Sequence, residues 1–242
     1  MAIIVGKVEA IFRYPVKSMR GEPLDTAAFG WHGIEGDRRL ALRRLDERGG
    51  FPWLSASRLP ELILFTPHGS RVEGAEPLPT HVRTPGGESL PAFGEALAAD
   101  IGRRLDAPVQ MMHLRQGVFD ETNISVITST TVSEVCGRAG TRADVRRFRP
   151  NVVIRSERPV PFEEDEWVGG VLAFGDSDDA PRVAVTMRDI RCAMVNFDPD
   201  DASAAPEMLK AVVRTHENTA GVYGVVTRIG NVAVGQAVFL HR

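Results

Sequence analysis

Short apolar runs that end at glycine or proline recur along the whole chain, and they restrict it to a fold made mostly of strands. Many of these runs are β-branched and alternate apolar with polar side chains, as half-buried antiparallel strands do. Many short strands with frequent turns are typical of barrels and sandwiches. The predicted strands are Lys7–Arg13, Arg39–Leu45, Leu62–Phe65, His81–Thr84, Val109–His113, Ser125–Thr128, Val152–Arg155, Val171–Phe174, Arg182–Met187, Val222–Ile229 and Val232–Leu240.

Three stretches instead repeat apolar residues at helical spacing. Phe93–Leu105 has one apolar face, Thr130–Ala139 follows a Ser/Thr cap, and Pro206–His216 starts with proline at the first helical position. The stretch Thr66–Pro91 is rich in proline and glycine and predicts turns between short strands. The pattern therefore predicts a mostly β, α+β protein, with a soft boundary near residues 105–122 between a β-rich unit and an α+β unit.

The composition is that of an ordinary globular protein: 242 residues, 43% hydrophobic and 25% charged, with a formal net charge of −3. This charge gives no reason to expect nucleic acid or an acidic membrane surface as a partner. The N-terminus lacks a signal-peptide pattern, and no apolar run approaches the roughly 18 residues of a spanning helix. Two cysteines form neither a disulfide framework nor a metal-type pair. We therefore expect a cytoplasmic protein that binds neither nucleic acid nor membrane.

Cys192 is the residue best suited to carry chemistry, because the guanidinium of the neighbouring Arg191 favours its thiolate form. Beside several predicted strands stand the side chains that bind oxyanions or polar heterocycles: a point charge, hydroxyls, guanidinium groups and an amide. They are Lys17, Ser18, Arg38, Thr122, Arg149 and Asn151. Each of these residues, taken alone, is equally explained as a solvent-exposed side chain at the end of a strand. Together with a thiol they describe a phosphorylated cofactor held by arginines, with its reactive atom on sulfur.

Other notable residues are better explained by structure alone. Cys136 lies on the apolar stripe of a predicted helix, which favours a packing role. The acidic run Glu163–Glu166 predicts a solvated turn. Trp31, Trp53 and Trp167 are predicted as anchors in the core or between domains.

Two groups of motifs resemble the MOSC family, which takes its name from the C-terminal part of molybdenum-cofactor sulfurases. Tyr14-Pro-Val-Lys-Ser18 followed by Gly36-Asp-Arg38 is similar to the motif of the N-terminal β-barrel in MOSC proteins. The two-part layout also resembles the mitochondrial amidoxime-reducing component and its bacterial relatives. The motifs that are similar to the MOSC domain itself are Arg147-Phe-Arg-Pro-Asn151, Phe162-Glu-Glu-Asp-Glu-Trp167, Arg191-Cys192 and Asp198-Pro199.

The resemblance implies an N-terminal β-barrel domain over residues 1–105 and a MOSC domain, a β-barrel with a few short helices, over residues 106–242. It implies a molybdenum–molybdopterin cofactor between the two, with Cys192 as molybdenum ligand and catalytic residue. A soft thiolate suits molybdenum that is bound by a dithiolene. The cofactor-binding residues that the resemblance implies are Lys17, Ser18, Arg38, Thr122, Asn123, Arg149, Asn151, Arg191 and Tyr223.

The chain departs from the family pattern at two places. The loop Asp198-Pro-Asp-Asp-Ala202 lacks the Thr-Gly that often follows Asp-Pro, and Ile190 stands where relatives carry serine. The chain also lacks the cysteines of the iron–sulfur domain that some bacterial relatives append. Electrons would therefore have to come from a separate electron-donor protein, a reductase.

Three functions fit these residues. The first is a molybdenum-dependent oxidoreductase that reduces small N-hydroxylated compounds by two-electron removal of oxygen. The second is a sulfur carrier or transferase that holds a persulfide on Cys192. The third is a non-catalytic module that binds or delivers the molybdenum cofactor. We favour the first, because the whole set of anion-binding side chains accompanies the cysteine.

Overall fold

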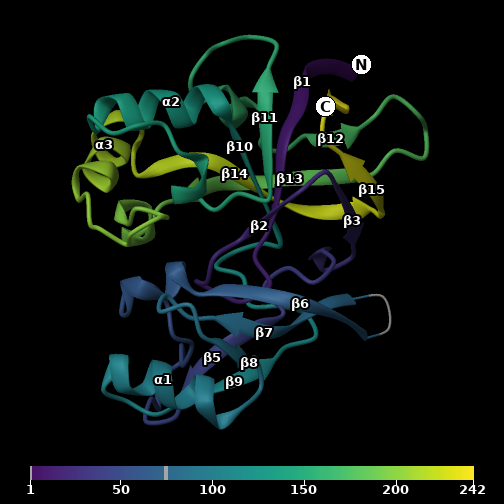
Figure 1. The fold of residues 1–242 in the computed structure, drawn as a ribbon. Coiled ribbons are helices and arrows are strands. Elements are labelled where there is room, and N and C mark those ends of the chain that lie inside the picture. Colours follow the sequence, from purple (N-terminus) through teal and green to yellow (C-terminus); the bar gives the residue numbers. More distant parts are fainter. Residues whose placement is uncertain (1, 74–75) are drawn as a thin grey trace.

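The computed structural model describes residues 2–73 and 76–242, which form two lobes, one above the other in Figure 1. The upper lobe combines the N-terminal strand with most of the chain after Asn123. The lower lobe is formed mainly by the segment from Leu40 to His113. None of the helices in the described residues is both long and apolar enough to cross a membrane.

The upper lobe is built on a closed barrel. An eight-stranded sheet runs in the order β11-β10-β14-β13-β12-β16-β1-β2, and an extra pairing between β1 and β11 closes seven of these strands into a ring. All neighbours run antiparallel except β10 and β11. The strands are β1 (Ala2–Arg13), β2 (Glu22–Leu24), β10 (Ile124–Thr128), β11 (Val152–Ser156), β12 (Val171–Phe174), β13 (Arg182–Ile190), β14 (Thr219–Arg228) and β16 (Ala237–His241).

A small sheet covers part of the barrel and shares its core. It runs in the order β15 (Gly230–Ala233), β3 (Thr26–Gly30) and β4 (Gly33–Ile34). Alternate side chains of the strands point into the barrel, so the core is rich in buried valine and isoleucine. Phe29 of the small sheet meets Phe174 of the barrel edge to face, with ring centroids 5.4 Å apart.

Helices cover the other side of the barrel (Figure 1). The parallel pair β10–β11 needs a crossover connection, and α2 (Ser129–Arg138) supplies it. The apolar stripe of α2 packs against α3 (Glu207–His216), and Cys136 lies fully buried between them, as its packing role predicts. The short 3₁₀ turns of this lobe are η2 (Val145–Arg147), η3 (Glu163–Trp167) and η4 (Ala193–Asn196).

The lower lobe has its own core under one helix. A two-stranded sheet pairs β5 with β9, and a three-stranded sheet runs β6-β7-β8. Its elements are β5 (Leu40–Arg44), η1 (Pro60–Leu64), β6 (Thr66–Glu73), β7 (Glu76–Arg83), β8 (Ser89–Pro91), α1 (Glu95–Leu105) and β9 (Val109–His113). Met194 and Phe197 of the upper lobe pack against this core. The segment after Cys192 therefore joins the two lobes.

The mostly β, α+β fold and its barrel are confirmed, and all three predicted helices are present. The division at residues 105 and 106 stays a prediction, and β1 from the first part pairs within the ring of later strands. The structure also contains β2, β3, β4, β6 and β8, which the apolar pattern did not predict as strands.

Four predictions are wrong in detail. Leu62–Phe65 was expected as a strand, but Pro60 starts the 3₁₀ turn η1 there. Val232–Leu240 is two strands, because Gly235 turns the chain at a φ of 87°. Trp31 is 62% exposed rather than an anchor. The acidic run is not fully solvated, since Glu163 and Glu164 are buried.

Candidate functional site

A cavity of about 250 Å³ lies beside Cys192 where the two lobes meet. We call it the cysteine cavity. Its lining comes from the β1–β5 connection, the segment that follows β5, the segment before β11, the end of β13 with the residues after it, and Tyr223 of β14. Of the residues predicted for the site, those that line the cysteine cavity are Lys17, Ser18, Arg38, Arg149, Arg191, Cys192 and Tyr223.

Cys192 lies between the end of β13 and the start of η4, where it is the N-cap residue, and it is exposed. Among the described residues no cluster of three or more His, Cys, Asp or Glu side chains has the arrangement of a metal site. A metal at Cys192 would therefore take its other ligands from something other than His, Cys, Asp and Glu side chains of the described residues. That arrangement suits a metal delivered within an organic cofactor rather than one held by protein side chains alone.

Arg191 is fixed from several sides. Its Nη1 donates to the Phe148 carbonyl at 2.7 Å, its Nε donates to the Ala220 carbonyl at 2.7 Å, and its Nη2 lies 2.8 Å from Asp189. Because the side chain is 6% exposed and bonded on several sides, this guanidinium is a fixed charge in the wall of the cysteine cavity.

Asp189 is buried in the same cavity and accepts a hydrogen bond from Ser125 Oγ at 2.9 Å. Burial raises the pKa of Asp189 to about 6, although Arg191 and Ser125 oppose that rise. Burial and the nearby Asp189 charge also raise the pKa of Tyr223 above its usual range. The cysteine cavity therefore contains a carboxyl group that exchanges its proton near neutral pH and a phenol that keeps its own.

On the opposite wall, Lys17 is 8% exposed and its Nζ lies 2.8 Å from Asp120 Oδ1. Burial alone would raise the pKa of Asp120, but the ammonium of Lys17 holds it below its usual value. The cavity thus carries more positive than negative charge. Lys17, Arg38, Arg147, Arg149 and Arg191 line it, against the two acids Asp120 and Asp189.

Three of the residues that line the cavity have a left-handed backbone. The φ angles are 66° for Ser18, 52° for Arg38 and 52° for Arg149. Residues other than glycine adopt this region at a cost, and such residues cluster at functional sites. At all three positions the fold keeps a polar or cationic side chain where glycine would be less strained, which points to a role for the side chain itself.

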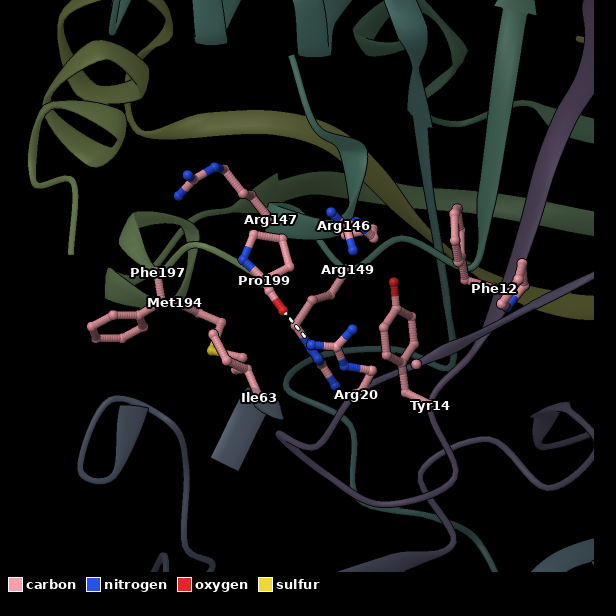
Figure 2. Close-up of a pocket in the computed structure, with 12 residues that line it drawn as sticks. Phe12, Tyr14, Arg20, Ile63, Arg146, Arg147, Arg149, Met194, Phe197 and Pro199 are labelled. Carbon is pink, nitrogen blue, oxygen red and sulfur yellow. Dashed lines mark hydrogen bonds between the residues drawn. The ribbon is translucent and has the colours of Figure 1, made fainter. Parts of the chain in front are cut away.

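The ring of Tyr14 packs against two of the arginines. The guanidinium carbons of Arg38 and Arg149 lie 4.8 and 4.2 Å from the centroid of its ring, and Figure 2 shows Arg149 beside it. Arg38 also bonds to Asp37, and its Nη2 donates to the Arg149 carbonyl at 3.1 Å. Burial lowers the pKa of Arg149 to about 10, so its charge persists at neutral pH.

Three predicted residues do not line the cysteine cavity. Thr122 Oγ1 donates to the Gly224 carbonyl at 2.9 Å, and Asn123 Nδ2 donates to the Trp31 carbonyl at 3.1 Å. Asn151 is fully buried behind the wall, where its Oδ1 accepts from the Ser125 amide at 3.1 Å. Its Nδ2 donates to Asp37 at 3.1 Å. A cofactor-binding role for these three residues stays a prediction.

Several side chains of the cavity were not singled out from the sequence. Asp120 and Asp189 pair with its cations, and Ser125 bonds to Asp189. Asp189 stands three residues before Cys192, so its position in that run was the available signal. Asp120 left no signal, because only folding brings it to Lys17 across 103 positions of the chain.

The sequence pattern of the MOSC domain matches residues 98–239, and that of the MOSC N-terminal beta barrel domain matches residues 5–131. Each match covers more than half of the chain. The chain belongs to the MOSC family. Membership of this family supports a molybdenum cofactor-binding role in general terms, and it confirms the resemblance that the motifs indicate.

Solved structures add a likeness of fold. The YuaD protein from Bacillus subtilis is 15% identical and has a TM-score of 0.53, over 100% of this chain and 97% of that one. YiiM from Geobacillus stearothermophilus is 20% identical with a TM-score of 0.39, over 50% of this chain and 54% of that one. The first likeness shows a similar fold and nothing more, and the second carries no argument. No curated protein matches the sequence.

The cysteine cavity fits the cofactor that the MOSC family implies. Molybdopterin is an anionic, phosphorylated heterocycle, and the excess of lysine and arginine over acid matches that charge. The exposed thiol of Cys192 is the soft donor of this set. Ser18, Ser125 and Tyr223 supply hydroxyl groups for the edges of a heterocycle.

Proposed function

We propose that this MOSC protein is an oxidoreductase that binds a molybdenum–molybdopterin cofactor in the cysteine cavity and reduces small N-hydroxylated compounds. Cys192 is the protein ligand of molybdenum in this proposal. The observation that carries it is that seven residues predicted for the site, from five separate parts of the chain, line one cavity that also contains the exposed Cys192. The family match supports the cofactor in general terms.

The residues of the chain have separate tasks in this proposal. Lys17, Arg38 and Arg149 bind the phosphate and the polar edge of the cofactor, and they need little rearrangement because each is already fixed by neighbours. Arg191 adds a fixed positive charge to the wall of the cavity, which would attract the anionic cofactor. The bound cofactor would supply the two-electron change in oxidation state, which no side chain here provides.

The net reaction breaks one N–O bond, takes up two electrons and two protons, and releases water. The electrons come from a separate electron-donor protein, since this chain has only two cysteines and cannot hold an iron–sulfur cluster of the ferredoxin type. Asp189 is suited to pass on a proton, because its pKa of about 6 leaves both protonation states accessible near neutral pH.

The test is molybdenum and pterin content of protein made in a cofactor-competent host, for the wild type, Cys192→Ala and Cys136→Ala. We expect near-stoichiometric molybdenum in the wild type and in the Cys136 variant, whose thiol is buried in the helical core. We expect little molybdenum in Cys192→Ala. Absence of molybdenum from the wild type would overturn the proposal.

X-ray absorption at the molybdenum edge then tests ligation directly. The wild type should show one more sulfur neighbour than any residual molybdenum in Cys192→Ala, and an unchanged sulfur count would exclude Cys192 as ligand. Turnover of an N-hydroxylated compound with a chemical reductant tests the reaction. Bound cofactor without such turnover would instead favour the non-catalytic binding module.

The exposed thiol beside Arg191 also suits the second function, a sulfur carrier or transferase. Intact-mass analysis distinguishes it. Cofactor-free protein that gains the mass of one sulfur atom, and loses that gain in Cys192→Ala, would favour a persulfide on this residue.

A further inference from the structure

Two apolar side chains lie at the opening of the cysteine cavity. Phe51 and Ile190 both line the cavity, and they remain 50% and 59% exposed. A side chain that lines a cavity and is still half exposed lies at its open side, so we call this pair the apolar mouth. A phosphorylated heterocycle is held by charges and hydrogen bonds, which neither side chain provides. The apolar mouth is therefore available for another molecule.

Ile190 belongs to the upper lobe, where it is the last residue of β13 and stands two positions before Cys192. Its backbone is held in the barrel, because β13 pairs Ile190 with Thr219 of β14. The amide of the next residue, Arg191, donates to the Asn218 carbonyl at 2.9 Å. The exposed side chain therefore starts from a fixed point in the wall that also contains Cys192.

Phe51 reaches the same cavity from the lower lobe, in the segment after β5. Its carbonyl accepts a hydrogen bond from Arg44 Nη2 at 3.0 Å, and the Pro52 carbonyl accepts one from the Arg44 amide at 2.9 Å. Arg44 is buried and pairs with Glu47 at 2.6 Å. The ring centroid of Phe51 lies 5.6 Å from Lys17 Nζ. The segment that carries the ring is thus anchored, although half of the side chain is open to solvent.

A single exposed apolar side chain is common on proteins, but here two of them, from different lobes, share one cavity. Among the exposed large apolar side chains in the described part of the chain, only these two line the cysteine cavity. Their area is far too small for a protein partner, since stable protein interfaces bury about 800 Å² on each side. It suits the apolar body of a small molecule.

We propose that the apolar mouth binds the body of the substrate, so that the substrates are N-hydroxylated compounds with an apolar group attached to the reacting function. The apolar group lies across Phe51 and Ile190 while the N–O group reaches the metal at Cys192. Burial of apolar surface supplies the binding free energy, so small polar hydroxylamines bind weakest. This proposal rests on the proposed function, because the reacting group must come to that metal. Phe51 and Ile190 select the substrate and take no part in breaking the N–O bond.

The test uses molybdenum-loaded protein and straight-chain amidoximes from acetamidoxime to hexanamidoxime, which differ only in the length of their apolar chain. Titration calorimetry without a reductant measures binding in the absence of turnover. Because a fully buried methylene tightens binding about fourfold, we expect each added methylene to tighten binding about two- to fourfold. Equal affinity along the series would overturn the proposal.

Two variants and two matched controls locate the contact. Phe51→Ala and Ile190→Ala should fold, because both side chains are half exposed. Each should weaken the binding of hexanamidoxime by about three- to tenfold and that of acetamidoxime by less. Phe93→Ala and Ile229→Ala change residues that are 52% and 48% exposed and lie outside the cavity lining, so they should bind like the wild type. The proposal fails if the first two variants behave like the controls.

Turnover with a chemical reductant separates this proposal from the proposed function. Phe51→Ala and Ile190→Ala should raise KM for hexanamidoxime more than they change kcat, because the same contact is made before and during the reaction. Reduction of the whole series without any dependence on chain length would overturn the role of the apolar mouth and leave the proposed function standing. Binding that depends on chain length without any reduction would overturn the reaction and leave the apolar contact standing.

Discussion

Arg191 Nη2 lies 2.8 Å from Asp189 Oδ2, and this ion pair is almost completely buried next to Cys192. The pair joins the end of β13 to the carbonyls of Phe148 and Ala220, because Arg191 donates to both. A guanidinium bound in this way has one orientation. The position of the Arg191 charge in the wall of the cysteine cavity is therefore set by the fold rather than by a mobile surface side chain.

The first prediction concerns this ion pair. Arg191→Met leaves Asp189 buried without its counter-ion and frees two carbonyl acceptors, so we expect a loss of about 3–5 kcal/mol in the free energy of unfolding. Urea denaturation followed by circular dichroism measures it. The control is Arg188→Met on the same strand, which breaks an exposed pair with Glu217 and a longer, partly buried pair with Asp165, and should shift the unfolding midpoint much less. Equal effects of the two variants would contradict the structural role of Arg191.

The second prediction concerns the two asparagines that the resemblance assigns to the cofactor. Asn151 is buried and bonds to Ser125, Asp37 and Phe12, so Asn151→Ala should lose about 2 kcal/mol of stability even without cofactor. Asn123 makes one bond at the surface, and Asn123→Ala should change stability by less than about 0.5 kcal/mol. Thermal unfolding of cofactor-free protein distinguishes the two, and a stable Asn151→Ala protein would refute this account.

The third prediction uses two glycines. Gly221 has a φ of 84°, and a Cβ there would lie 2.7 Å from the Val126 carbonyl oxygen and 3.0 Å from Arg191 Nη2. Gly221→Ala should therefore destabilise the protein by about 1–3 kcal/mol and displace Arg191. Gly137 lies within α2 with open space around it, so Gly137→Ala should stabilise by up to about 1 kcal/mol. Chemical denaturation should show that Gly221→Ala lowers the free energy of unfolding and that Gly137→Ala raises it.

The fourth prediction concerns Glu164 and pH. This buried carboxyl accepts hydrogen bonds from Thr128 and Thr131, yet burial raises its pKa above the usual 4.5. An acid whose pKa is raised by folding stabilises the native state below its unfolded pKa, and that contribution is lost as pH rises through its folded pKa. The contribution of Glu164 to wild-type stability should therefore fall as the pH rises from its unfolded pKa to its folded pKa.

Glu164→Gln keeps an acceptor for the Thr128 amide but cannot ionise, so it should flatten this part of the pH profile. Denaturant unfolding at several pH values above 4 measures it. The exposed Glu166 serves for comparison, because Glu166→Gln should leave the profile unchanged. A profile that Glu164→Gln does not alter would show that another group sets the slope.

Local patterns determined much of the fold. The strands Val109–His113 and Val171–Phe174 appear with their predicted ends, and helix α3 follows its predicted proline start. These elements are encoded by neighbours in sequence, through alternation, apolar periodicity and helix-start residues. The pattern failed for Leu62–Phe65, because a run of four apolar residues fits a buried 3₁₀ turn as well as a strand.

The candidate site was likewise predicted from the sequence only in part. The chemical types of Cys192, Lys17 and Arg149 were enough to suggest an anionic cofactor, since charge, hydroxyl and thiol are properties of single residues. Only the tertiary structure decided which of the predicted residues share a cavity, that Asn151 bonds to the Ser125 amide, and that Asp120 pairs with Lys17. Closure of the barrel and docking of the lobes bring these positions together, and a contact across 103 residues has no local signal in the chain.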